Sequence, residues 1–123
     1  KYILLISTLM FSAGSWAEWT PVGDSVSGSV TYVDRDRIRK VKGLVYYWAI
    51  IDRLEPNDMG QLSGKFYFKA DCETMRAMPL SRSEHRLPMG EGDAITTYTP
   101  DPEWSYAPPD SVLEIILEAV CNH

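Results

Sequence analysis

The placement of two cysteines constrains this fold more than any other feature, because each ends a segment with a different hydrophobic period. Over residues 65–72 the side chains alternate, so one face of a strand carries Phe66, Phe68, Ala70 and Cys72. Over residues 111–121 the period is helical, and one stripe carries Val112, Leu113, Ile116, Leu117, Val120 and Cys121. Both thiols therefore face inward if a C-terminal helix packs on a β-sheet, where a disulfide would fasten it.

The first 17 residues have the pattern of a secretory signal peptide. Lys1 precedes an apolar run over residues 2–11, and Ser15 and Ala17 supply small residues before a cleavage site. A first strand or an N-terminal anchor is the alternative interpretation of this run. Cleavage after Ala17 leaves residues 18–123, which we expect to form a single domain. No cysteine lies near the site, so the sequence predicts an exported protein, periplasmic or secreted, with no lipid anchor and no membrane span after cleavage.

Export changes the interpretation of the cysteines. An oxidising compartment favours disulfides, and Cys72 and Cys121 allow only one intramolecular pairing. A metal pair or a redox dithiol would need CxxC spacing or histidine partners, which the sequence lacks. The sequence therefore predicts a structural disulfide between Cys72 and Cys121, with a loop-closure contribution of roughly 4 kcal/mol.

The remaining segments indicate an α+β domain. Strands are expected at residues 18–23, 29–33, 44–51, 65–72, 73–86 and 95–99, and a helix at residues 111–121. Ser111 and Glu114 have the spacing of a capping box, and Asp34 can cap one helical turn in the charged connector over residues 34–40. Residues 55–62 and the proline-rich residues 100–109 are expected to be loops. The predicted fold is an antiparallel sheet of about five or six strands, with one C-terminal helix packed on it and fastened by the disulfide.

The sequence contains no motif that indicates catalysis. Apart from the terminal His123, His85 is the one histidine, and it lies in a polar stretch that predicts a solvated side chain. No nucleophile motif, zinc-binding motif, calcium-binding loop or phosphate-binding glycine loop accompanies it. We therefore expect no enzymatic activity, no catalytic residue, no metal and no cofactor.

The distribution of charge favours a binding protein. Net charge is −5, which argues against nucleic-acid binding. Lys and Arg are absent after residue 87, whereas a basic cluster lies in the connector and the turn that follows it. The predicted binding residues combine this cluster with nearby tyrosines, namely Arg35, Arg37, Arg39, Lys40, Lys42, Tyr46, Tyr47 and Tyr67. The alternative is a solvated charged turn beside tyrosines that belong to the core.

The order of landmarks along the chain resembles the surface-adhesin protein E family of small exported proteins from Gram-negative bacteria. The landmarks are Trp19, residues 32–34 followed by Ile38, residues 48–52, residues 71–72, residues 89–90, Trp104, residues 108–111 and residues 120–121. The resemblance implies an antiparallel sheet with a disulfide-fastened C-terminal helix. It also implies a non-enzymatic adhesin that contacts host extracellular-matrix proteins and can dimerise. This chain lacks a lipidation cysteine, which favours a periplasmic or released protein.

Two hypotheses follow about the partner, which in both cases is a protein. The first is an adhesin-like module that contacts matrix proteins, with a homodimer as a further assembly. The second is a periplasmic accessory protein, such as an envelope-stress factor or an inhibitor that acts on another bacterial protein.

Overall fold

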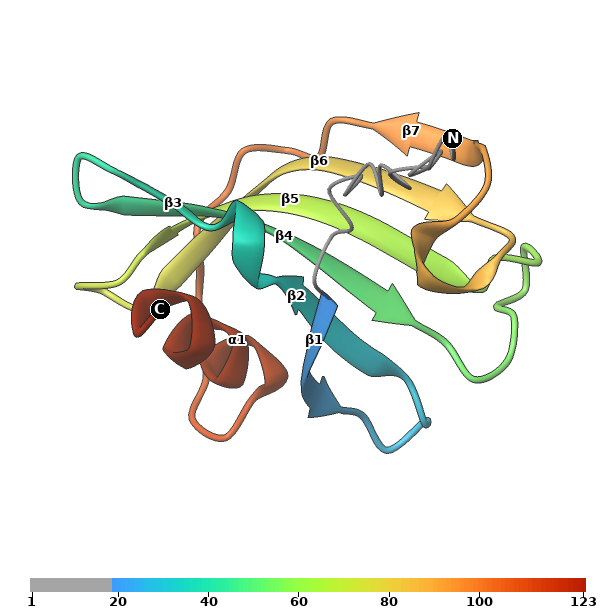
Figure 1. Cartoon of the computed structure of the whole chain (residues 1–123), viewed down its shortest axis with the longest axis horizontal. Coiled ribbons are helices and arrows are strands. Elements are labelled where there is room, and N and C mark those ends of the chain that lie inside the picture. The colour runs from blue at the N-terminus through green and yellow to red at the C-terminus, as the bar shows by residue number, and fades with distance from the viewer. Residues whose placement is uncertain (1–18) are drawn as a thin grey trace, which may run out of the picture.

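Eight β-strands and one α-helix make up the part of the chain that the computed structural model describes, residues 19–123 (Figure 1). The predicted signal peptide lies outside these residues. The strands are β1 (Trp19–Asp24), β2 (Val30–Asp34), β3 (Arg39–Val41), β4 (Leu44–Asp52), β5 (Ser63–Asp71), β6 (Arg76–His85), β7 (Ala94–Tyr98) and β8 (Ser105–Tyr106). The helix is α1 (Val112–Cys121), and two short 3₁₀ turns are η1 (Arg35–Arg37) and η2 (Pro88–Gly90).

All of these strands belong to one antiparallel sheet. The main path runs in the order β1-β2-β4-β5-β6-β7, while β3 pairs with β4 and β8 pairs with β6. The strands β4, β5 and β6 are the longest, and the strand order places them side by side inside the sheet. The predicted antiparallel sheet with a C-terminal helix is thus confirmed, and two short strands are added to the predicted count.

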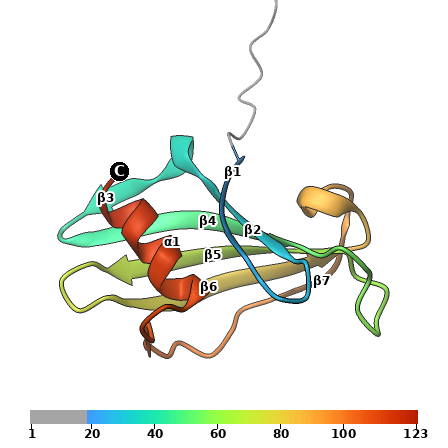
Figure 2. The same ribbon diagram turned by 90° about the horizontal axis from the view of Figure 1, so that it is seen from below.

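The two faces of the sheet have different surroundings, and the alternation along β4 separates them. Val45, Tyr47 and Ala49 are buried, and in the register with β5 they lie opposite the apolar side chains Ala70, Phe68 and Phe66. We call this side the helix face, because α1 packs on it at one end of the sheet (Figure 2). Tyr46 and Trp48 point to the other side, which we call the open face.

The helix forms where the sequence predicts it. Its N-cap is Ser111, whose Oγ accepts a hydrogen bond from the Glu114 backbone N–H at 3.1 Å. Its apolar stripe buries Ile116, Leu117 and Val120 against the helix face. The predicted disulfide between Cys72 and Cys121 is present, with Cα atoms 5.8 Å apart, so it joins the end of β5 to the end of α1.

The charged connector over residues 34–40 holds more structure than predicted. Asp34 caps the turn η1 as expected, because its Oδ1 accepts from the Asp36 backbone N–H at 3.1 Å. The chain then forms β3, which the prediction lacks, and turns back into β4 through two residues with positive φ, Lys42 (50°) and Gly43 (81°). Two consecutive residues of positive φ characterise the type I′ hairpin turn. The other added strand, β8, lies within the predicted loop over residues 100–109.

Over residues 19–123, no helix has both the length and the apolar character that crossing a membrane requires.

Candidate functional site

Three aromatic rings lie next to one another on the open face. Tyr67 of β5 occupies the centre, with its ring centroid 4.6 Å from that of Trp48 and 6.2 Å from that of Tyr46. Direct pairing of Trp48 with Tyr67 in the β4–β5 register brings the first two rings together. All three side chains are half-buried, so each presents part of its ring to solvent.

Arg39 lies beside two of these rings, and two further cations lie beside a fourth ring, that of Trp104. The Arg39 Nη2 atom donates a hydrogen bond to the Tyr67 hydroxyl at 3.0 Å, and the Arg39 Cζ atom lies 5.7 Å from the Tyr46 ring centroid. Arg76 Cζ lies 4.2 Å and Lys69 Nζ 5.5 Å from the Trp104 ring centroid. These distances fall within the range of cation-π attraction. We define the aromatic-basic face as Arg39, Tyr46, Trp48, Tyr67, Lys69, Arg76 and Trp104.

The strand register explains why basic and aromatic residues alternate here. Arg39 of β3 pairs with Tyr46 of β4, and Tyr46 pairs with Lys69 of β5. Neighbouring strands lie about 4.8 Å apart, so directly opposed side chains on one face touch or nearly touch. The row therefore places an aromatic ring between two cations across three strands.

A carboxylate positions one of these cations. Asp71 Oδ2 lies 3.3 Å from Arg76 Nη2, which orients the Arg76 guanidinium beside Trp104. A hydrogen bond from the Thr74 side chain, reinforced by backbone N–H groups and by Arg76, lowers the pKa of Asp71. Asp71 therefore remains ionised to lower pH than an ordinary carboxyl group, and its charge offsets that of Arg76.

The structure brings together three of the eight predicted binding residues, Arg39, Tyr46 and Tyr67. The other basic residues lie elsewhere. Arg37 Nε lies 3.6 Å from the buried Asp34 carboxylate, and Arg35 belongs to the same η1 turn. Lys40 neighbours Arg39 on β3 but points to the helix face, where its Nζ donates to the backbone carbonyl of His123 at 2.8 Å.

Two further predicted binding residues, Lys42 and Tyr47, also lie outside the aromatic-basic face. Lys42 is exposed in the β3–β4 turn. Tyr47 requires a correction, because its side chain is 0% exposed and its ring stacks on Phe68 in the core with centroids 5.4 Å apart. The alternation along β4 turns Tyr47 away from Tyr46, so it cannot contact a partner in this fold.

Sequence reasoning missed four residues of the aromatic-basic face: Trp48, Lys69, Arg76 and Trp104. Trp48 shares the alternation of Tyr46, and Lys69 that of Tyr67, so the period of two could have found both. Trp104 belongs to the segment that leads into β8, and its approach to Arg76 depends on tertiary structure alone.

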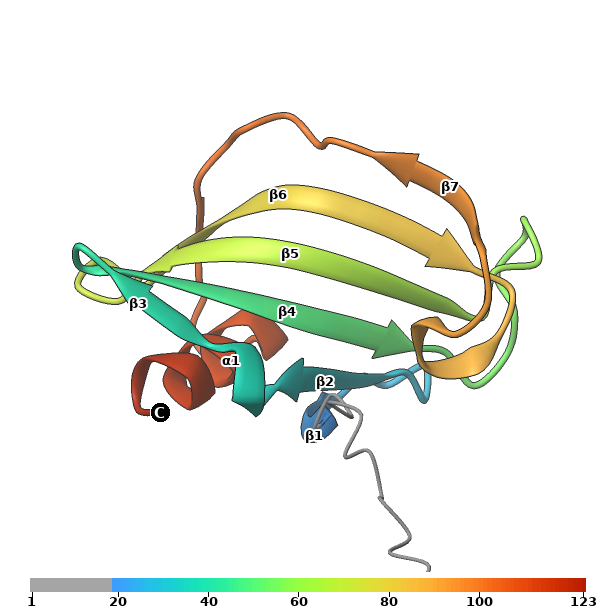
Figure 3. The same cartoon turned by 45° about the horizontal axis from the view of Figure 1, so that its top comes forward.

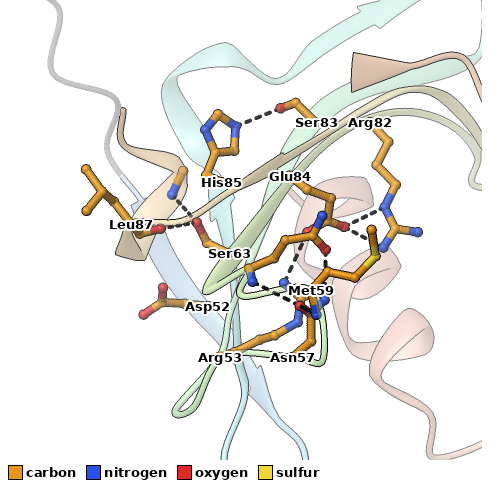
Figure 4. A network of polar contacts seen from close by, with 12 residues as sticks. Asp52, Arg53, Asn57, Met59, Ser63, Arg82, Ser83, Glu84, His85 and Leu87 are labelled. Atoms are coloured by element: carbon orange, nitrogen blue, oxygen red, sulfur yellow. Dashed lines mark hydrogen bonds and ion pairs between the residues drawn. The ribbon is translucent and has the colours of Figure 1, made fainter. Parts of the chain in front are cut away.

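His85 was predicted to be solvated, and the structure shows that it is buried, with 5% of its surface exposed. Its Nδ1 atom lies 3.2 Å from the Gly92 carbonyl oxygen. Its Nε2 atom lies 2.8 Å from the Ser83 hydroxyl (Figure 4). A carbonyl oxygen only accepts, so Nδ1 donates to Gly92, and in the neutral ring Nε2 then accepts from the Ser83 hydroxyl. Both ring nitrogens are thus engaged, Nε2 within β6 and Nδ1 with the segment that follows this strand.

This segment covers the far end of the open face. Ser63 Oγ donates to the Leu87 carbonyl at 2.6 Å and accepts from the Gly90 N–H at 2.8 Å (Figure 4). Gly90 has φ +66°, and a Cβ atom there would lie 2.8 Å from Lys65 Cε. The η2 turn therefore packs tightly on the sheet and leaves the aromatic-basic face as the uncovered part.

Among residues 19–123, no three or more His, Cys, Asp or Glu side chains lie close enough together to hold a metal ion. The arrangement on the open face instead suits contact with a larger molecule. Partly exposed rings offer apolar area, and flanking cations attract acidic groups.

Comparisons with known proteins agree on one fold. A family model described as surface-adhesin protein E matches residues 19–122. Crystal form II of Haemophilus influenzae protein E superimposes with a TM-score of 0.65 at 14% identity, covering 87% of this chain and 89% of that one. Protein E from non-typeable Haemophilus influenzae gives a TM-score of 0.59 at 14% identity, covering 89% of this chain and 79% of that one. No curated protein sequence matches the chain significantly.

Proposed function

Because the chain belongs to the surface-adhesin protein E family, we propose that it is an exported, non-enzymatic binding module that contacts host extracellular-matrix proteins through its aromatic-basic face. The observation that carries this proposal is the continuous row of rings and cations around Tyr67. Aromatic and arginine side chains dominate the energetics of protein interfaces. Family membership supplies the adhesive role, and the row supplies a surface suited to it.

The charge of this face points to an acidic partner segment. Arg39, Lys69 and Arg76 stand against Asp71 alone in the ion pairs of the face, although the whole chain carries a net charge of −5. A locally basic surface on an acidic protein attracts acidic partners selectively and repels basic ones. Binding through this face should therefore weaken as salt rises.

The proposal that the chain has no enzymatic activity rests on the family and on His85. This histidine is buried, and both of its nitrogens are used to hold backbone and side-chain neighbours. Replacing His85 by Ala should therefore lower stability, and it should leave matrix binding by the folded protein unchanged.

The test is binding of the purified protein to a panel of immobilised matrix proteins at low and high salt, with denatured protein as the control. We expect saturable binding to at least one matrix protein. This binding should weaken at high salt, because added salt shortens the Debye screening length from about 8 Å to about 3 Å. Binding no stronger than that of denatured protein across the whole panel would overturn the adhesin proposal.

Fractionation of the native cell tests export separately. We propose that the exported chain begins at Glu18, after removal of residues 1–17, so N-terminal sequencing should start there. Retention in the periplasm together with no matrix binding would favour the accessory or inhibitor role instead.

A further inference from the structure

The disulfide is only partly shielded from solvent. Cys72 and Cys121 are both half-buried. The core on which they pack is covered more completely, with Val45 4% and Val120 0% exposed. Exposed disulfides exchange with thiols more readily than buried ones, and they are the labile or regulatory disulfides of proteins. The surroundings of this bond therefore decide whether a thiol can reach it in the folded protein.

A cavity of about 200 Å³ opens beside the bond. The β3–β4 turn, the end of β5 and the end of α1 meet at one end of the sheet (Figure 3). The cavity lies between them and is lined by Lys40, Gly43, Leu44, Val45, Cys72 and Cys121. An apolar cavity of about 150 Å³ is large enough for benzene, so this one has room for a small thiol.

Gly43 leaves the disulfide uncovered on the side of the hairpin. Leu44 pairs with Asp71 in the antiparallel β4–β5 register, so the next position on each strand places Gly43 opposite Cys72. Beyond its chain neighbours, no atom of residues 19–123 lies within 4 Å of the position that a Cβ atom on Gly43 would take. Its φ of +81° favours glycine, so the turn that reverses the chain also keeps the cavity open.

The charge at the cavity suits a thiolate. Among the residues that line it, Lys40 alone is charged. Its Nζ atom donates to the His123 backbone oxygen at 2.8 Å, which holds the ammonium group at the end of the chain segment that follows α1. A nearby cation stabilises the thiolate form of a sulfur, and the thiolate is the form that attacks a disulfide.

The end of the helix determines which sulfur is attacked. Cys121 is the last residue of α1, and the last turn contains no basic residue. The partial negative charge of a helix C-terminus disfavours a thiolate at Cys121, whereas a strand such as β5 has only a small dipole beside Cys72. Each cysteine has one acidic neighbour outside the ion pairs of the described residues, Glu73 and Glu118 respectively. The dipole therefore makes Cys72 the better leaving group.

We propose that the Cys72–Cys121 bond is a thiol-exchange site of the folded protein, which a small thiol reaches through the cavity at Gly43. The thiolate attacks Cys121 Sγ and forms a new S–S bond there, while the bond to Cys72 Sγ breaks and Cys72 leaves as a thiolate. A second thiolate then attacks the added sulfur and releases Cys121. Two thiols are thereby oxidised to one disulfide, and the disulfide of the protein is reduced.

Exchange at this site frees the end of α1 from β5, while the apolar stripe of the helix stays on the helix face. The site is separate from the aromatic-basic face, so the two can be tested independently.

The first test measures how the rate of reduction responds to urea. The native protein is treated with 2-mercaptoethanol and quenched with acid, and mass spectrometry counts the alkylated cysteines. About 1 M urea raises the unfolded fraction by at least about fivefold. Because the reagent attacks the folded protein, its rate should change by less than about twofold, relative to the rate with a small model disulfide.

The size of the reagent supplies a second readout. A thiol-terminated polyethylene glycol has a similar thiol but does not fit the cavity. Native protein should therefore prefer 2-mercaptoethanol over this polymer several-fold more strongly than protein unfolded in concentrated urea does.

A pair of variants tests the route to the bond. Leu44→Trp places a larger side chain on the wall of the cavity and should slow reduction by the small thiol. Val41→Trp is the matched control, because Val41 pairs with Leu44 across the hairpin but does not line the cavity. If Leu44→Trp does not fold, the comparison of the two reagents on native protein still decides the route.

Peptide mapping tests the order of attack. Cleavage after Lys69, Arg76 and Arg86 places the two cysteines on separate fragments. The added thiol should appear on the fragment with Cys121, and the free thiol on that with Cys72.

Three outcomes would overturn the proposal. A rate that rises about fivefold or more in about 1 M urea would show that reduction requires unfolding. An equal preference between reagents in native and unfolded protein would show the same. An added thiol on Cys72 would contradict the order of attack.

Discussion

Removing the disulfide should cost this protein a large part of its stability. The bond joins Cys72 to Cys121 across a sequence separation of 49 residues, a loop that contains β6, β7, β8 and α1. The chain-entropy relation assigns about 4 kcal/mol to closing a loop of this length in the unfolded state. Small domains have about 5–15 kcal/mol of net stability, so the variant Cys72→Ala/Cys121→Ala should remain folded but with a low margin.

The assay is urea unfolding of the native protein and the double variant, followed by tryptophan fluorescence and circular dichroism. We expect the free energy of unfolding to fall by about 4 kcal/mol, and the melting temperature by roughly 15 °C or more. Reducing the native disulfide with a thiol reagent should give the same free energy as the double variant, which serves as the control.

A loss below about 1 kcal/mol would refute this reasoning. It would mean that the apolar stripe of Ile116, Leu117 and Val120 holds α1 on the sheet without help from the cross-link. A loss of cooperative unfolding would also contradict it, because the helix would then detach before the sheet unfolds.

Two further predictions concern single buried or hydrogen-bonded groups. The Tyr47 hydroxyl is buried without a hydrogen-bond partner among the described residues, and this burial raises its pKa. Because Tyr47→Phe removes an unsatisfied buried hydroxyl, it should increase the free energy of unfolding by about 1 kcal/mol in urea titrations. Hydrogen bonding from Thr74 lowers the pKa of Asp71 in the folded state below its ordinary value of 3.8. The ionised carboxylate therefore contributes stability above pH 3.8 that is lost as pH falls through the lower folded-state pKa. The stability difference between native protein and Asp71→Asn should accordingly shrink on acidification, as thermal melts over a pH series would show; a constant difference would contradict the assignment.

The sequence correctly predicted the long elements, in which one face is buried along most of the length. The period of two over β5 and the helical period over α1 both record burial on one side, and each leads to an inward-facing cysteine, Cys72 directly after β5 and Cys121 at the end of α1. Periodicity reports local exposure, so it identified β5, the helix and the inward direction of both thiols, whereas a run that is apolar on both faces identified the central strand β4.

Short elements were missed because their stability comes from tertiary pairing. The β3 strand has only three residues, all exposed, and its turn uses Lys42 before Gly43 in place of the asparagine or aspartate that usually signals a type I′ turn. The burial of His85 depends on the return of the chain at Gly92, which no local pattern in the sequence records.

The candidate site was predictable only in part, because its residues meet through pairing between strands rather than through a local pattern. Alternation separates Tyr46 from Tyr47, and it would have separated Arg39 from Lys40 if β3 had been recognised. The meeting of Arg39 with Tyr67 requires the register of three strands, and register between strands that are far apart in sequence depends on the whole sheet.

The comparison of Arg39→Ala with Lys40→Ala tests most directly the claim that the aromatic-basic face binds a matrix protein. Each substitution removes one exposed positive charge from neighbouring positions of β3. The Arg39 side chain points to the open face, whereas that of Lys40 points to the helix face. For a matrix protein that binds the native chain, we predict a loss of about 5- to 30-fold for Arg39→Ala, as for an interface arginine worth about 1–2 kcal/mol, and nearly unchanged binding for Lys40→Ala. Equal losses in the two variants, or a larger loss for Lys40→Ala, would contradict the claim.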